Sequence, residues 1–207
     1  MSNLHPEILN EAQHQLLPFI KTFAKEYYLV GGTAVSLQIG HRQSIDFDLF
    51  KKSNISKTKI VKRLAEFGLS YQLLYTNSES FHIIVNDVKI TFFEYPYPIP
   101  TSKSFEKIKI PDLQTLAAMK AFALGRRVKW KDYVDLYFIL RDFTDLNTII
   151  MQSQQIYGSL FSGKLFRQQL CYFKDLDYSE EVFYLGNAAV SDETIKGFLT
   201  EIATSYD

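Results

Sequence analysis

Residues 30–50 read VGGTAVSLQIGHRQSIDFDLF, and the order of features in this stretch decides the fold. The apolar run YYLV at residues 27–30 predicts a short buried strand that the glycine pair Gly31 and Gly32 stops. Residues 33–39 then have helix-like apolar spacing, and a further glycine follows them as a helix end commonly requires. The stretch therefore begins with a strand, a glycine turn and a short helix.

The end of the same stretch, SIDFDLF at residues 44–50, alternates apolar and polar residues. This alternation predicts a strand with its apolar side chains on one face and Asp46 and Asp48 on the other. Two carboxylates separated by one residue on a strand lie roughly 6–7 Å apart and are able to converge on a divalent ion. Mg²⁺ commonly takes one or two protein carboxylates together with water and substrate phosphates. An exposed strand edge that carries two acids and no ligand is the alternative interpretation.

The glycine pair has two interpretations as well. Glycines between a strand and a helix free backbone N–H groups to approach a phosphate near the positive end of the helix dipole. A tight turn without a ligand has the same local sequence. The acidic strand that follows Gly31 and Gly32 favours the phosphate-binding interpretation.

Beyond this stretch, the sequence predicts a sheet-rich part followed by a helical part. A helical pattern interrupted by proline covers residues 4–25, and Ser56 is predicted to cap a helix that ends at Gly68. Strands are predicted at 71–75, 81–85 and 88–95, the last two joined by a tight turn at Asn86-Asp87. The proline-rich residues 96–100 form an extended connector. Helices are predicted from Asp112 onward and near 131–142, 146–157, 162–174 and 191–204.

Composition narrows the class of protein. With 207 residues, 46% hydrophobic residues and one cysteine, the chain has the size for a buried core and lacks the cysteines for an internal disulfide or a cysteine-rich zinc site. No apolar run approaches the roughly 20 residues that span a bilayer, and the polar start has no signal-peptide core. We therefore expect a cytoplasmic protein without a membrane partner.

The net charge of zero hides an uneven distribution. Residues 1–131 hold 18 Lys and Arg against 11 Asp and Glu, whereas residues 132–207 hold 5 against 12. A basic N-terminal part is compatible with a phosphate-rich ligand, because clustered cations raise the local concentration of anions. Solvated helix faces produce the same bias.

The order strand, glycine pair, helix and acidic strand resembles the polymerase-beta-like nucleotidyltransferase superfamily, whose motif is Gly-Gly or Gly-Ser followed ten to fifteen residues later by DxD. More narrowly, residues 29–50 resemble the AbiEii/AbiGii abortive-infection toxins, which commonly show GGTAL, then HR, then DFDLF. The stretch VKITFFEYPYP at residues 88–98 is similar to the middle strand of that family. The resemblance implies an α+β fold. A nucleotidyltransferase core of small mixed sheet with flanking helices, residues 1–105, would precede a helical domain, residues 106–207.

A second block, MKAFALGRRVKWKDYVDLYFIL at residues 119–140, resembles the motif of the helical half of that family. The matching residues are Lys120, Ala123, Arg127, Lys131, Asp132 and Asp135. Within one continuous helix, offsets of 7 and 11 bring the three cations to nearly the same azimuth. If the helix breaks near RRVKW, the loop must bring them together instead. A run of basic residues without such a match is usually a solvated surface.

The resemblance also implies roles for residues of this chain. Asp46 and Asp48 would hold Mg²⁺ or Mn²⁺, and a glycine turn would cradle the β- and γ-phosphates of an NTP. The residues expected to be catalytic are Asp46, Asp48, Lys120 and Asp132. The residues expected to bind the nucleotide are Gly31, Gly32, Thr33, Arg42, Arg127, Lys131 and Asp135. For Arg42 a structural salt bridge is an equal alternative.

One position departs from the superfamily. Many of its enzymes carry a third carboxylate on a later strand, and the matching residue here is Thr91. Glu94 lies three residues further and is predicted to point to the opposite face. The third acid is therefore either supplied from elsewhere, such as Asp132, Asp135 or a distorted Glu94, or absent. His82, in the strand before, is predicted to be a packed or edge histidine.

The leading hypothesis is a nucleotidyltransferase that moves NMP from an NTP to tRNA or to a protein hydroxyl. By resemblance, the protein would be the toxin of a toxin–antitoxin or phage-defence pair, with a cognate antitoxin as partner. The rival hypothesis, favoured by Thr91, is a catalytically weak or inactive nucleotide-binding or interaction module on the same fold.

Overall fold

A computed structural model describes residues 4–205, and the chain divides into two compact units, Met1–Asp112 and Leu113–Asp207. The first unit contains the whole sheet and the second is helical. The predicted α+β class, a mixed sheet followed by a helical half, is therefore confirmed. The boundary between the units falls after a short hairpin of strands that the sequence analysis did not predict, so it lies beyond residue 105.

The first unit is built around one seven-stranded mixed sheet with the strand order β3-β4-β5-β2-β1-β7-β6. Its helices are η1 (Pro6–Ile8), α1 (Glu11–Lys21), α2 (Gly31–Ile39) and α3 (Lys57–Glu66). Its strands are β1 (Tyr28–Val30), β2 (Asp46–Lys51), β3 (Gln72–Thr76), β4 (Ser80–Val85), β5 (Val88–Glu94), β6 (Lys103–Phe105) and β7 (Ile108–Ile110). Strand β2 pairs antiparallel with β1 and parallel with β5, which places it in the middle of the sheet.

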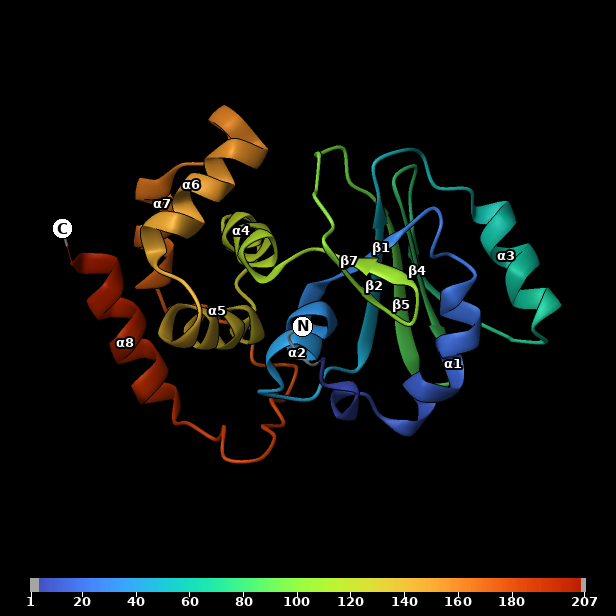
Figure 1. Ribbon diagram of the computed structural model, residues 1–207, viewed down its shortest axis with the longest axis horizontal. Helices are drawn as coiled ribbons and strands as arrows, with labels where there is room; N and C mark the ends of the chain where they lie inside the picture. The colour runs from blue at the N-terminus through green and yellow to red at the C-terminus, as the bar shows by residue number, and fades with distance from the viewer. Residues whose placement is uncertain (1–3, 206–207) are drawn as a thin grey trace. The chain divides into compact units, whose positions relative to one another are not determined.

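The two faces of the sheet are covered by different helices. Helices α1 and α3 lie on one side of the sheet and α2 lies on the other (Figure 1). On the side of α1, Phe23 and Tyr27 pack against Phe92 of β5, with ring centroids 4.8 and 5.5 Å apart. The side chains of Phe47 and Leu49 are fully buried. The acidic positions of β2 therefore face away from α1.

Local sequence explains the ends of several elements. Gly40 ends α2 in the left-handed conformation, with φ +67°, as predicted. Asn86 and Asp87 both have positive φ, which is the signature of the tight turn predicted between β4 and β5. Pro18 lies inside α1 and does not end it. The side chain of Asn10 and that of Gln13 cap the start of α1 reciprocally, which favours the helix despite its proline.

The hairpin of β6 and β7 was missed because its turn has unusual chemistry. Glu106 and Lys107 adopt φ +51° and +73°, a conformation for which glycine and asparagine are the usual signals. The hairpin extends the sheet through the pairing of Tyr28 in β1 with Lys109 in β7. The sheet is consequently two strands wider than predicted.

The second unit is formed by helices alone among its described elements. These are α4 (Leu113–Leu124), α5 (Trp130–Asp142), α6 (Leu146–Tyr157), η2 (Gly158–Leu160), α7 (Gly163–Leu170) and α8 (Asp192–Thr204). Helix α4 is buried on nearly all sides, and its Phe122 stacks on Tyr157 of α6 with centroids 3.7 Å apart. Helix α4 ends at Leu124 and α5 begins at Trp130, so the helix breaks within the second sequence block.

Candidate functional site

The two aspartates of β2 lie on one face of the sheet, on the side opposite its buried aromatic core. Along β2, Phe47 and Leu49 are fully buried, whereas Asp46 and Asp48 are partly exposed. The predicted alternation is thus confirmed from Asp46 to Leu49, whereas Ile45 precedes the strand and is exposed. In the parallel pairing with β5, Asp46 is opposite Lys89 and Asp48 is opposite Thr91. The face that carries the carboxylates therefore continues onto the next strand.

Asp48 lies directly against the backbone of Gly31. Gly31 has φ +72°, and a Cβ added there would lie 2.1 Å from Asp48 Oδ2. Both the backbone conformation and the close approach require glycine at this position. The pairing of Val30 in β1 with Asp48 in β2 brings the start of α2 against the acidic strand, and glycine is required where the two meet.

Gly32 makes room for a different side chain. A Cβ at position 32 would lie 2.5 Å from Nη2 of Arg42, which is almost fully buried. Arg42 Nη1 also donates a hydrogen bond of 2.9 Å to the backbone carbonyl of Gln43. The two glycines therefore serve different neighbours, one a carboxylate and one a guanidinium.

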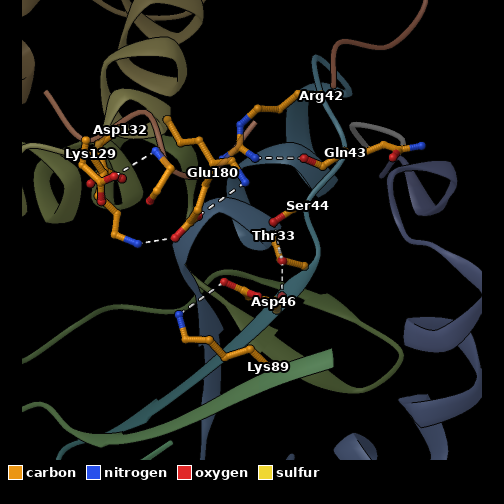
Figure 2. Close-up of polar contacts among 12 residues, drawn as sticks. Thr33, Arg42, Gln43, Ser44, Asp46, Lys89, Lys129, Asp132 and Glu180 are labelled. Carbon is orange, nitrogen blue, oxygen red and sulfur yellow. Dashed lines mark hydrogen bonds and ion pairs between the residues drawn. The ribbon is translucent and has the colours of Figure 1, made fainter. Parts of the chain in front are cut away.

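Thr33 connects α2 to the acidic strand. Its buried hydroxyl lies 2.8 Å from the Ser44 hydroxyl and donates to the backbone carbonyl of Asp46 (Figure 2). Gln13 Nε2 of α1 contacts the same carbonyl at 3.5 Å. These contacts fix the backbone at Asp46, so the Thr33 side chain positions the strand.

Lys89 is a cation beside the carboxylates that sequence analysis did not single out. Its Nζ lies 3.5 Å from Asp46 Oδ2, as Figure 2 shows. A positive charge at this distance offsets part of the repulsion between two neighbouring carboxylates. The parallel pairing of β2 with β5 brings Lys89 there, and no local sequence signal gives the register of two strands 43 residues apart.

The position across from Asp48 on β5 holds a hydroxyl. The pairing of β2 with β5 is regular from Asp46 to Lys51, so Glu94 points to the opposite face as predicted. Thr91 Oγ1 lies 3.3 Å from Nδ1 of His82 on β4. Burial lowers the pKa of His82, and the nearby charge of Lys89 lowers it further. An imidazole thus lies next to the residue that takes the place of a third acid.

In the second unit, Lys120 of α4 is buried between two carboxylates of α5. Its Nζ lies 2.7 Å from Asp132 Oδ1 and 2.6 Å from Asp135 Oδ2. Arg127, in the connection between the two helices, forms a bidentate pair with Asp132 at 2.9 and 3.2 Å. The helix break therefore brings Lys120 and Arg127 to one carboxylate, the second of the two arrangements considered for this block.

The carboxyl group of Asp132 is ionised in this arrangement. Burial by itself would raise its pKa, but the charges and hydrogen bonds of Lys120 and Arg127 outweigh burial and hold the pKa below its usual value. Asp132 also lies in the first turn of α5, where the helix dipole favours a negative charge. The cluster of Lys120, Arg127, Asp132 and Asp135 balances two positive against two negative charges.

Lys131 belongs to a separate ion-pair cluster. Its Nζ lies 3.4 Å from Glu180 Oε2, and Lys129 pairs with the other carboxylate oxygen of Glu180, as Figure 2 shows. Lys120 and Arg127 thus share Asp132, whereas Lys131 has a different acidic neighbour. Asp177, whose backbone exchanges hydrogen bonds with Val128 and Trp130, positions the segment that carries Glu180.

The residues on the acidic face fit a divalent cation whose remaining ligands come from substrate and water. Among residues 4–205, no group of three or more His, Cys, Asp or Glu is arranged to enclose a metal by itself. Two carboxylates, however, are the usual protein contribution to a Mg²⁺ ion that also binds substrate phosphates. The carboxylate of Asp48 lies beside the start of α2, where the N-terminal backbone N–H groups favour phosphate.

Comparisons with known proteins agree with this geometry. The family model described as "Nucleotidyl transferase AbiEii toxin, Type IV TA system" matches residues 19–158. An uncharacterized protein of Aquifex aeolicus (strain VF5) is 31% identical over 173 residues, covering 76% of this chain and 78% of that protein. In the described part of the chain, no helix combines the length and apolar character needed to cross a membrane.

Two solved structures share the fold. MenT4, a nucleotidyltransferase toxin of Mycobacterium tuberculosis H37Rv, superposes with a TM-score of 0.64 at 14% identity, covering 95% of this chain and 82% of that one. JHP933 of Helicobacter pylori superposes with a TM-score of 0.58 at 18% identity, covering 97% and 91%. These likenesses establish the architecture, and the family match covers both sequence blocks. The chain belongs to the AbiEii nucleotidyltransferase toxin family of type IV toxin–antitoxin systems.

Proposed function

We propose that this protein transfers NMP from an NTP to a hydroxyl group of an RNA, such as tRNA, or of a protein. The observation that carries the proposal is the contact of Gly31 with Asp48, which joins a helix start to two carboxylates on one strand face. In this proposal Asp46 and Asp48 hold Mg²⁺ or Mn²⁺. The ion would neutralise charge that develops on the phosphates as pyrophosphate leaves.

The residues around the carboxylates have distinct tasks in the proposal. The backbone N–H groups at Gly31 and Gly32 face the β- and γ-phosphates, since Val30 provides no side-chain cap for the start of α2. Thr33 holds Asp46 in place through the backbone carbonyl. Lys89 limits repulsion between the carboxylates before the substrate arrives.

The basic residues of the second unit remain predicted triphosphate contacts. Arg127 is the strongest of them, because half of its side chain is exposed while Lys120 is buried between carboxylates. Arg127→Gln is expected to weaken NTP binding measured by calorimetry, and Arg141→Gln, an exposed arginine of α5, serves as its control. Asp132 and Asp135 orient Lys120 and Arg127. A cognate antitoxin and a cytoplasmic location are parts of the same proposal.

A second candidate is a nucleotide-binding module without catalysis. Thr91 favours it, because a hydroxyl occupies the position opposite Asp48 where a third carboxylate would extend the acidic face. The two candidates predict the same affinity for NTP and differ in whether label is transferred.

The test compares wild type with Asp46→Asn and Asp48→Asn. Each protein is incubated with each of the four NTPs labelled at the α-phosphate, with Mg²⁺ or Mn²⁺ and with bulk tRNA or cell lysate. Transfer by wild type that is abolished in both variants supports the enzyme. Asp87→Asn is the matched control, since Asp87 is an exposed turn residue with positive φ that asparagine adopts readily. Nucleotide binding by wild type without transfer to either acceptor supports the module instead.

A further inference from the structure

The acidic face of the sheet continues from Asp48 to a histidine two strands away. Thr91 of β5 is paired with Asp48 of β2 on one side and with His82 of β4 on the other. Residues paired across neighbouring strands point to the same face of a sheet. Asp48, Thr91 and His82 therefore form a row, and Tyr75 of β3, the partner of His82, extends it to the edge strand.

The imidazole of His82 is held on both sides within this row. Its Nδ1 lies 3.3 Å from Thr91 Oγ1, and its ring meets the ring of Tyr75 edge-on with centroids 5.6 Å apart. Thr91 is almost fully buried, whereas His82 is partly exposed. Neighbouring strands lie about 4.8 Å apart, so the backbones of Asp48 and His82 are separated by roughly 10 Å. Asp48 and His82 therefore lie on the same face of the sheet with Thr91 between them.

Several charged and titratable groups lie on the strands around His82, and of these Lys89 favours its neutral form. On β5 these are Lys89 and the hydroxyl of Thr91, on β3 the phenol of Tyr75, and on β2 the carboxylates of Asp46 and Asp48. Burial and Lys89 lower the pKa of His82 from its ordinary value of 6.5. The imidazole is consequently able to accept a proton at neutral pH.

We infer that His82 is the general base of the transfer reaction and that Thr91 positions it. This inference rests on the proposed function. If Nδ1–H donates to Thr91 Oγ1, the lone pair of Nε2 is left for the acceptor hydroxyl, as in other sites where a third group sets the tautomer of a histidine base. His82 then supplies the proton acceptor that Thr91, which lacks a carboxylate, does not provide.

The chemical step is balanced as follows. The oxygen of the acceptor hydroxyl forms a bond to the α-phosphorus of the NTP, and its proton moves to Nε2 of His82. The bond between the α-phosphorus and the bridging oxygen breaks, and that electron pair leaves with pyrophosphate. The imidazolium then returns its proton to solvent. The negative charge of the phosphates is neutralised by the cationic groups assigned to them in the proposed function.

The first test is structural and needs no substrate. Nitrogen-15 NMR of the full chain assigns the tautomer and the pKa of His82, with its signals identified by their loss in His82→Gln. We expect the Nδ1–H tautomer with a pKa below 6.5 in wild type and in Thr91→Ser, and a mixture of tautomers in Thr91→Val. A wild type that holds the Nε2–H tautomer overturns the inference, because Nε2 is then unable to accept a proton.

The second test is kinetic and uses α-labelled NTP, Mg²⁺ and bulk tRNA across pH 5 to 8. Wild-type turnover is expected to fall as the pH drops through the pKa of His82. His82→Gln should lower turnover about 100-fold or more, the usual contribution of a general base, and should remove this pH dependence. His14→Gln is the matched control, because His14 is exposed on α1. Thr91→Val should lower turnover, and Thr91→Ser should retain it.

The outcomes distinguish a failure of the proposed function from a failure of the inference about His82. A wild type that transfers no label to tRNA or lysate overturns the proposed function and this inference together. A wild type that transfers label, loses transfer in Asp48→Asn and keeps its rate and pH profile in His82→Gln overturns the inference alone. If His82→Gln does not fold, the comparison of Thr91→Val with Thr91→Ser still decides, since only the serine retains the oxygen next to Nδ1.

Discussion

Gly31 and Asp48 approach each other so closely that a Cβ at position 31 would lie 2.1 Å from the carboxylate oxygen Oδ2. The glycine also has φ +72°, so it is required both for space and for backbone conformation. Because Val30 pairs with Asp48, the start of α2 lies beside β2, and the glycine turn and the acidic strand form one structural feature.

Gly31→Ala is expected to have a much larger effect on the rate of nucleotidyl transfer than on the unfolding midpoint. The added methyl group displaces the Asp48 carboxylate, and a displacement of about 1 Å in a catalytic group commonly costs about 100-fold in rate. Gly68→Ala is the matched control, because Gly68 has a similar φ of +64° but nothing within 4 Å of the added Cβ. Rates and unfolding midpoints of both variants measure the difference. Equal rates in the two variants would contradict the importance of the contact.

Thr33→Val is expected to destabilise the first unit by about 1–3 kcal/mol, since it leaves the part-buried Asp46 carbonyl and the buried Ser44 hydroxyl without their shared partner. Thr58→Val, at an exposed position of α3, should change the free energy of unfolding by less than about 0.5 kcal/mol. Denaturant unfolding measures both. If Thr33→Val leaves stability unchanged and weakens NTP binding, the hydroxyl contacts phosphate and does not hold the strand.

Much of the first unit follows from local sequence. The alternation around Asp46 and Asp48 predicts which face each side chain takes, because side chains alternate along a strand. The turn at Asn86-Asp87 also determines the register of the two strands that it joins. A two-residue turn pairs the residues on either side of it, so counting outward places His82 opposite Thr91. The register between β4 and β5 could therefore have been predicted.

Other relationships depend on contacts that local sequence does not encode. The pairing of β2 with β5 brings Lys89 to Asp46 across 43 residues. The β6–β7 hairpin was missed because Glu106 and Lys107 replace the expected turn residues. In the helical unit, the spacing of the cations suggested one shared face, but the helix break at Leu124 sends Lys131 to Glu180.

Lys120→Met is expected to destabilise the second unit by about 3–5 kcal/mol, because it leaves two buried carboxylates without their shared cation. Lys164→Met, on the exposed surface of α7, is the control. The double variant Lys120→Met/Asp135→Asn should lose less free energy of unfolding than the two single variants lose in sum, because Asp135→Asn removes one of the unpaired charges. Urea unfolding of wild type, the two single variants, the double variant and Lys164→Met gives the comparison. A stable Lys120→Met protein with weakened NTP binding would indicate that this lysine contacts the triphosphate directly.

The stabilising contribution of Asp132 is expected to vanish at low pH. Its pKa is lowered in the folded protein, so the unfolded chain binds the proton more readily. The contribution is therefore fully present when the pH lies above about 3.9, the pKa of Asp in the unfolded chain. It is lost as the pH falls through the lower pKa of the folded protein. The difference in unfolding free energy between wild type and Asp132→Asn, measured from pH 7 to pH 2.5, should shrink below about pH 4. A difference that does not vary with pH would show that ionisation of Asp132 is not what stabilises the cluster.

The most direct test of the central claim compares two labels on the same NTP. Wild-type protein is incubated with bulk tRNA or lysate, Mg²⁺ and an NTP labelled at either the α- or the γ-phosphate. Nucleotidyl transfer predicts that the α-label enters the macromolecule and that the γ-label appears in pyrophosphate. With Asp48→Asn, neither labelled product is expected. Entry of the γ-label into the macromolecule, or α-label transfer that persists in Asp48→Asn, would contradict the account.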